Sequence, residues 1–67
     1  MGLKRYYIDT SPLSGEAQKQ AIDFIESASY NSQYIPGSKG CFFTFWPENE
    51  QPALLPSLSQ CIVKEMP

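Results

Sequence analysis

The sequence predicts a small α+β domain in which one amphipathic helix packs on a small, mainly antiparallel sheet, in the order β-α-β-β. Three observations lead to this prediction. Residues 3–9 are rich in side chains that favour strands, and residues 12–29 carry apolar side chains at intervals of three or four. Residues 41–46 form an aromatic run that is typical of a strand. A chain of 67 residues forms a single domain, positions 1–67, with one modest core.

The first predicted strand covers residues 3–9, with the sequence LKRYYID. Tyr6, Tyr7 and Ile8 favour a pleated, half-buried surface. The alternation is poor, because each face of the strand would carry one basic residue beside its apolar ones. This mixture suits an edge strand or a strand that is in contact on both faces.

The helix is predicted for about residues 12–29. Ser11 before Pro12 makes a good N-cap with proline at the first helical position, and Ser14 is a later candidate cap. The apolar side chains that follow form one stripe that a core can bury. The stripe consists of Leu13, Ala17, Ala21, Phe24, Ile25 and Ala28, and Ile22 widens it.

A hairpin or pair of strands is predicted for residues 33–46. Residues 33–35 form a short first strand, the turn residues PGSKG follow, and CFFTFW forms the central strand. Pro47 ends this strand and opens an irregular, proline-rich loop over residues 47–57.

The last segment, residues 58–66, is predicted as a strand or a short helix. Cys61, Ile62 and Val63 favour a strand, whereas Leu58, Ile62 and Met66 recur every four residues. The strand is preferred, because an isolated hairpin needs a third strand to be stable.

Composition excludes several classes of function. The net charge of −2 and the pI of about 4.8 argue against general affinity for nucleic acid or anionic membranes. No apolar run is long enough to span a membrane and no secretion signal is found, so a cytoplasmic location is expected. Histidine is absent, which removes the usual general base and the commonest metal ligand. We therefore expect no enzyme activity, no cofactor and no metal site.

The two cysteines, Cys41 and Cys61, are placed by this prediction in two strands that pair at the centre of the sheet. The simpler interpretation is a pair of buried thiols that act as small apolar residues. The alternative is a disulfide, which would stabilise the fold by roughly 3 kcal/mol through closure of a loop of about 20 residues. The sequence leaves both open.

The aromatic strand provides the candidate binding residues. Alternation separates Cys41, Phe43 and Phe45 from Phe42, Thr44 and Trp46, and one helix covers only one face of a sheet. The first set is expected to pack on the helix, which leaves Phe42 and Trp46 on an open face. Tyr6 is expected to join them there, with Glu48 and Glu50 as a polar rim. The alternative is that residues 52–58, which include Leu54, Leu55 and Leu58, fold back and cover that face.

The function expected from these residues is that of a small, non-catalytic module that binds another protein. It would act as an inhibitor or regulatory adaptor, like many small proteins of phages and other mobile elements in size and composition. Two alternatives remain. One is a homodimeric structural protein, and the other is a weak single-stranded nucleic-acid binder that uses an aromatic strand face.

Overall fold

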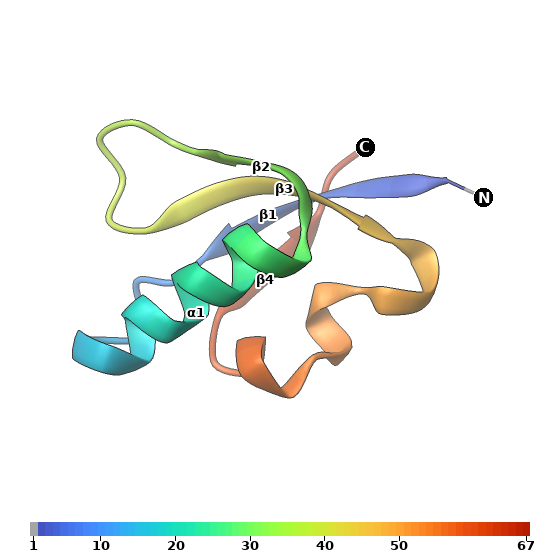
Figure 1. Ribbon diagram of the computed structural model, residues 1–67. Helices are drawn as coiled ribbons and strands as arrows, with labels where there is room; N and C mark the ends of the chain where they lie inside the picture. The colour runs from blue at the N-terminus through green and yellow to red at the C-terminus, as the bar shows by residue number, and fades with distance from the viewer. Residues whose placement is uncertain (1) are drawn as a thin grey trace.

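The computed structural model describes residues 2–67 and confirms the predicted fold class, with one α-helix packed on a four-stranded antiparallel sheet (Figure 1). The chain order is β-α-β-β-β, one strand more than the minimum that the sequence predicts. The elements are β1 (Leu3–Asp9), α1 (Gly15–Ala28), β2 (Tyr30–Tyr34), β3 (Cys41–Pro47) and β4 (Ile62–Glu65). The strand order β2-β3-β1-β4 places β1 and β3 at the centre of the sheet.

The β1 strand is the one that organises the sheet. It pairs with β3 along its whole length, from Leu3 opposite Pro47 to Asp9 opposite Cys41. Its other edge pairs with β4 from Tyr6 to Asp9. Strand β1 is therefore a central strand and not an edge strand, and because α1 covers only one face of the sheet, it does not have contacts on both faces either.

The helix begins later than the N-cap at Ser11 would predict. The backbone N–H of Leu13 donates to the carbonyl of Thr10 at 3.0 Å, and the N–H of Ser11 donates to the Asp9 carboxylate at 2.9 Å. These bonds close a turn that turns the chain away from β1 before the helix begins. Ser14, the later candidate, is the N-cap residue, although its side chain donates or accepts no capping bond.

The β2 strand begins directly after the helix, earlier than the predicted residues 33–35. Asn31 has a positive φ of 53°, which asparagine tolerates better than most residues. The pairing with β3 shifts between Tyr30 and Gln33 at this point, which marks a bulge. Asn31, a residue type common in turns, thus distorts β2 and does not end it.

The proline-rich segment is more regular than predicted. It forms three short 3-10 helices, η1 (Glu48–Glu50), η2 (Pro52–Leu54) and η3 (Pro56–Leu58). The latter two each begin with proline, whose fixed φ suits the first helical position. The final segment is a strand, β4, as preferred from the sequence.

The two faces of β3 are the reverse of the prediction. Phe42 and Trp46 are each 2% exposed, and Thr44 is fully buried beside them, whereas Cys41, Phe43 and Phe45 are only partly buried. The core consists of Tyr6, Ile8, Ala21, Ile25, Phe42, Trp46 and Leu58. Phe24 of α1 stacks on Trp46 with 6.3 Å between ring centroids. The exposure predicted for Tyr6, Phe42 and Trp46 is therefore wrong.

The cover of this face comes from two segments. Figure 1 shows α1 and the 3-10 segments on the same side of the sheet. Leu58 of η3 is buried, and Leu55 packs against the core, so residues 52–58 do cover Trp46, as the alternative expected. They lie beside the helix, however, and do not occupy the opposite side. No helix or other strand of residues 2–67 lies on the opposite face of the sheet, and the C-terminal tail, residues 66–67, rises past the sheet on that side (Figure 1).

Gly40 joins the loop before β3 to the start of the helix. Its φ is +105°, and its carbonyl accepts hydrogen bonds from the backbone N–H of Thr10 at 3.0 Å and from Thr10 Oγ1 at 2.7 Å. Gln18 Nε2 completes the contact by donating to the carbonyl of Lys39 at 2.8 Å. A Cβ at position 40 would lie 2.2 Å from Thr10 Oγ1 and 2.6 Å from Gln18 Nε2.

Burial of Trp46 predicts a blue-shifted fluorescence emission that a neutral quencher does not reduce. Trp46→Ala should cost about 3–5 kcal/mol of unfolding free energy, because a large ring leaves the core. A small domain has about that much stability in total, so the variant should be largely unfolded. Emission typical of a hydrated indole in the folded protein would contradict this packing.

Gly40→Ala should lower the free energy of unfolding by about 2–4 kcal/mol. The change adds the backbone penalty of a positive φ to the loss of the Thr10 and Gln18 hydrogen bonds. Gly37 is the matched control, since its φ is +81° and a Cβ there would meet nothing within 4 Å. Gly37→Ala should cost only about 1–2 kcal/mol. Urea unfolding measures both variants. If Gly40→Ala and Gly37→Ala lower the free energy of unfolding equally, the contact with Thr10 does not contribute to stability.

Candidate functional site

The uncovered side of the sheet, here called the open face, is defined by the strand register. Phe43 lies opposite Tyr7 of β1 and Gln33 of β2, and Tyr7 lies opposite Lys64 of β4. In an antiparallel pair, directly opposed residues point to the same face. The open face consists of Leu3, Arg5, Tyr7, Asp9, Tyr30, Gln33, Cys41, Phe43, Phe45, Pro47, Ile62 and Lys64.

Aromatic rings occupy the centre of the open face. Tyr7 and Phe43 lie on the two central strands with 5.8 Å between ring centroids and an interplanar angle of 58°. The guanidinium carbon of Arg5 lies 4.5 Å from the centroid of Phe43, within the range of a cation–π interaction. Phe45 follows two residues along β3, opposite Arg5 on one side and Tyr30 on the other. The result is a patch of aromatic rings with the Arg5 guanidinium over one of them, that of Phe43.

Charge is unevenly divided between the two sides of the molecule. Arg5 and Lys64 lie on the open face, whereas Asp9 at its end is the one acidic residue there. The others lie on α1, on η1 or on the covered face, and they are Glu16, Asp23, Glu26, Glu48, Glu50 and Glu65. The open face is thus the basic side of a chain whose net charge is −2.

Two ionisable groups at the end of the open face are held by hydrogen bonds. Tyr7 Oη donates to Cys41 Sγ at 3.2 Å, and this bond, with partial burial, raises the pKa of Tyr7 to about 12. The backbone and side chain of Ser11 donate to Asp9, which lowers the pKa of that carboxyl group. Near neutral pH, Tyr7 therefore keeps its proton and Asp9 its charge.

The structure does not gather the five predicted binding residues on one surface. Tyr6, Phe42 and Trp46 belong to the core, as described above. Glu48 and Glu50 are exposed, but they lie on η1, on the covered side of the sheet (Figure 1). The predicted arrangement of aromatic anchors with a glutamate rim is therefore absent from the described part of the chain.

Both cysteines are free thiols. The prediction that they lie on two paired strands is wrong. Strand β1 lies between them, because Asp9 faces Cys41 of β3 on one side and Ile62 of β4 on the other. Because strands lie about 4.8 Å apart, two strand spacings put the Cα atoms of Cys41 and Cys61 about 10 Å apart. A disulfide requires Cα atoms within about 7 Å, so the disulfide alternative does not fit this sheet.

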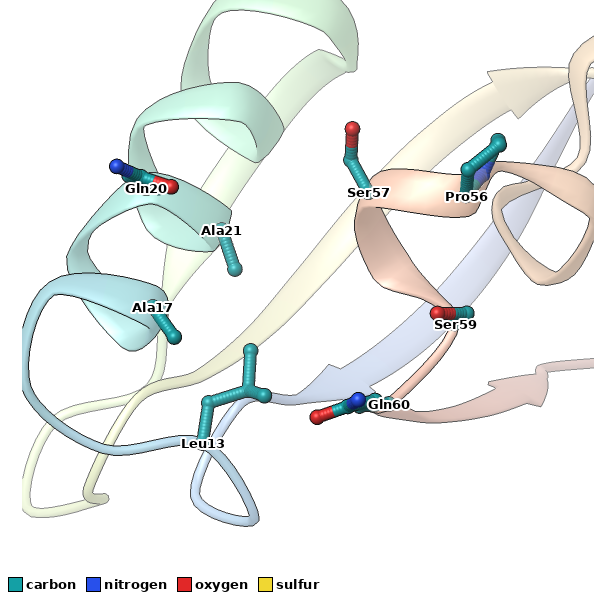
Figure 2. Close-up of a pocket in the computed structure, with 8 residues that line it drawn as sticks. All are labelled: Leu13, Ala17, Gln20, Ala21, Pro56, Ser57, Ser59 and Gln60. Atoms are coloured by element: carbon teal, nitrogen blue, oxygen red, sulfur yellow. The ribbon is translucent and has the colours of Figure 1, made fainter.

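A groove of about 260 Å³ lies on the covered side, between α1 and η3 (Figure 2). Ala17 and Ala21 of the helix point toward η3, and Leu13 and Gln60 close one end. Its polar groups are the amides of Gln20 and Gln60 and the hydroxyls of Ser57 and Ser59, none of which ionises near neutral pH. This groove offers hydrogen bonds but no group for acid–base chemistry.

Two further features bear on the classes of function. Among residues 2–67, no three His, Cys, Asp or Glu side chains come together in a group that could hold a metal ion. No helix in that range has the length and apolar character needed to cross a membrane. In comparisons with known proteins, no family model, curated protein or solved structure matches the chain.

Sequence reasoning missed Tyr7, Phe43, Arg5 and Lys64 as surface residues. Alternation puts Arg5 and Tyr7 on the same face of the first strand, and a charged residue on that face indicates that it is exposed to solvent.

Cys41→Ala should return the pKa of Tyr7 from about 12 toward its ordinary value of 10.0, because the sulfur acceptor is lost. The folded pKa of Tyr7 lies above the unfolded one. The stability that this bond contributes is therefore complete below pH about 10 and is lost as pH rises toward about 12. Ultraviolet titration of tyrosinate measures the shift, with Cys61→Ala as the control. Identical titration curves for the two variants would contradict the bond.

Proposed function

We propose that the open face binds single-stranded nucleic acid. In this proposal Tyr7, Phe43 and Phe45 stack on bases, while Arg5 and Lys64 contact phosphates. The observation that carries the proposal is the combination of a central aromatic patch with one cation over it and another beside it, on a face that no helix of residues 2–67 covers. Aromatic side chains bind bases of any sequence, because every base has a π face.

The positions of the aromatic residues within the sheet support the proposal. One widespread way to hold single-stranded RNA is a four-stranded sheet whose two central strands carry aromatic side chains that stack two or three bases. Here the central strands are β1 and β3, and they provide Tyr7, Phe43 and Phe45. The chain departs from that pattern at Cys41, where an aromatic residue is typical. Fewer stacked bases and weaker binding are therefore expected.

The uneven distribution of charge between the two faces also supports nucleic-acid binding by the open face. Net charge argues against nucleic acid, but a ligand meets the local face and not the whole chain. Arg5 and Lys64 lie on this face, and Lys39 lies in the loop that leads into β3. Six of the seven acidic residues lie away from it, as described above.

Docking on another protein was the function expected from Phe42 and Trp46 as anchors. Both side chains are buried, so that proposal has lost the residues on which it was based. A homodimer through the sheet is also less well supported. The edge strand β2 is bulged, the edge strand β4 is short and carries Lys64 and Glu65, and such edges discourage strand pairing. Two open faces in contact would also bring Arg5 and Lys64 of both copies together.

Phe43→Leu should weaken binding of a short labelled oligonucleotide by about 5- to 150-fold, because stacking contributes roughly 1–3 kcal/mol per base. The substitution keeps an apolar side chain of similar size. Tyr34→Leu is the matched control, since Tyr34 is an exposed aromatic residue on the covered side of the sheet. Fluorescence anisotropy at low salt measures both, with ribo- and deoxyribo-oligonucleotides.

Wild-type affinity should also fall as salt rises, with a log–log slope of about −1.4 for two phosphate contacts on a single strand. Absence of salt-dependent binding by the wild type would contradict the proposal. Equal affinity of Phe43→Leu and wild type would remove the open face as the binding surface, and a protein or a second copy would become the better candidate partner.

A further inference from the structure

A notch in the sheet adjoins the open face. The β4 strand ends at Glu65, opposite Tyr6, whereas β1 continues to Leu3. Only the backbone N–H of Met66, which donates to the Arg5 carbonyl at 2.8 Å, follows the free edge of β1 beyond this point. A hollow of about 420 Å³ lies there, lined by Leu3, Lys4, Arg5, Phe45, Glu65 and Met66 among others.

The notch is continuous with the proposed stacking surface. Phe45 and Arg5 line the hollow and also belong to the open face. The hollow therefore passes around the free edge of β1, from Arg5 and Phe45 on the open face to Lys4 and Glu65 on the covered side, and a base next to one stacked on Phe45 can enter it there. The volume lies within the range of pockets that hold small organic groups, which are mostly apolar with a few polar groups that fix orientation.

Three charged side chains line the notch, Lys4, Arg5 and Glu65, and two of them form an ion pair. Lys4 Nζ donates to Glu65 Oε2 at 3.2 Å, and both side chains remain partly exposed. The ammonium group has further protons to donate, and the carboxylate has a second oxygen to accept. Leu3, Phe45 and Met66 supply apolar walls beside this pair. The site thus suits a flat ring whose edge carries an acceptor next to donors.

We propose that the notch holds a guanine base of the bound strand, an inference that rests on the proposed function. Guanine presents O6 as an acceptor, followed along the same edge by the N1–H and N2–H₂ donors. Lys4 donates to O6, and the two oxygens of Glu65 accept from N1–H and N2–H₂. Adenine carries an amino group where guanine has O6, and uracil and thymine lack the second donor beside the first.

The test compares three oligonucleotides of about eight nucleotides, within the usual range of site sizes. One contains thymidine alone, the second has one central guanosine, and the third has inosine in its place. Inosine lacks only the N2 amino group. Wild-type protein should bind the guanosine strand about tenfold more tightly than the inosine strand, because a bidentate contact loses one of its two bonds.

Glu65→Gln should remove the preference for the guanosine strand over the inosine strand, while the loss of one negative charge changes the affinity for all three strands by the same factor. The Lys4–Glu65 pair is exposed, so its loss has little effect on folding. Glu26→Gln, an exposed carboxylate on the helix, is the matched control and should keep the preference. All strands are measured by anisotropy under one set of conditions.

The outcomes separate this inference from the proposed function. Equal binding of the guanosine and inosine strands by wild type overturns the guanine notch, while tight binding of the thymidine strand leaves the stacking surface standing. An unchanged preference in Glu65→Gln also overturns it, because the carboxylate then reads no base. If wild type binds none of the three strands, both proposals fail.

Discussion

Burial of the β3 side chains Phe42, Thr44 and Trp46 is the constraint on which the rest of the structure depends. A strand has two faces, and one helix of 14 residues does not cover a four-stranded sheet alone. Segment η3 lies beside α1, so that Leu58 and Phe24 both pack in the core around Trp46. The alternate residues of β3, Cys41, Phe43 and Phe45, then point to the opposite face, which is the open face.

Most of the fold could be predicted because its patterns are local. The strand character of residues 3–9, the apolar stripe of the helix and the strand preference near Ile62 each depend on neighbours within a few positions. The helix start could not be predicted as well, because it depends on how Asp9 and Thr10 bond to the residues after them. Asparagine is common in turns and in bulges alike, so the bulge at Asn31 is evident only from the pairing of β2 with β3.

The candidate site was harder, since both phases of CFFTFW are aromatic and alternation alone does not say which is buried. Thr44 seemed to mark an exposed phase. In the fold its hydroxyl accepts a hydrogen bond from Trp46 Nε1, which satisfies two polar groups within the core. The charges posed the same difficulty. Arg5 and Lys64 are 59 positions apart in a chain of 67, and only the β1–β4 pairing brings them to one face.

The central place of β1 has a consequence for the way the chain acquires its structure. Strand β1 pairs with β3 and β4, both of which follow the helix in the chain. Its residues Tyr6 and Ile8 therefore reach their partners only across long stretches of intervening chain. Contacts this distant along the chain slow folding, because the entropy of closing a long loop is lost before they form. Assembly of the sheet is then a late and concerted event, in which both neighbours of β1 arrive after it.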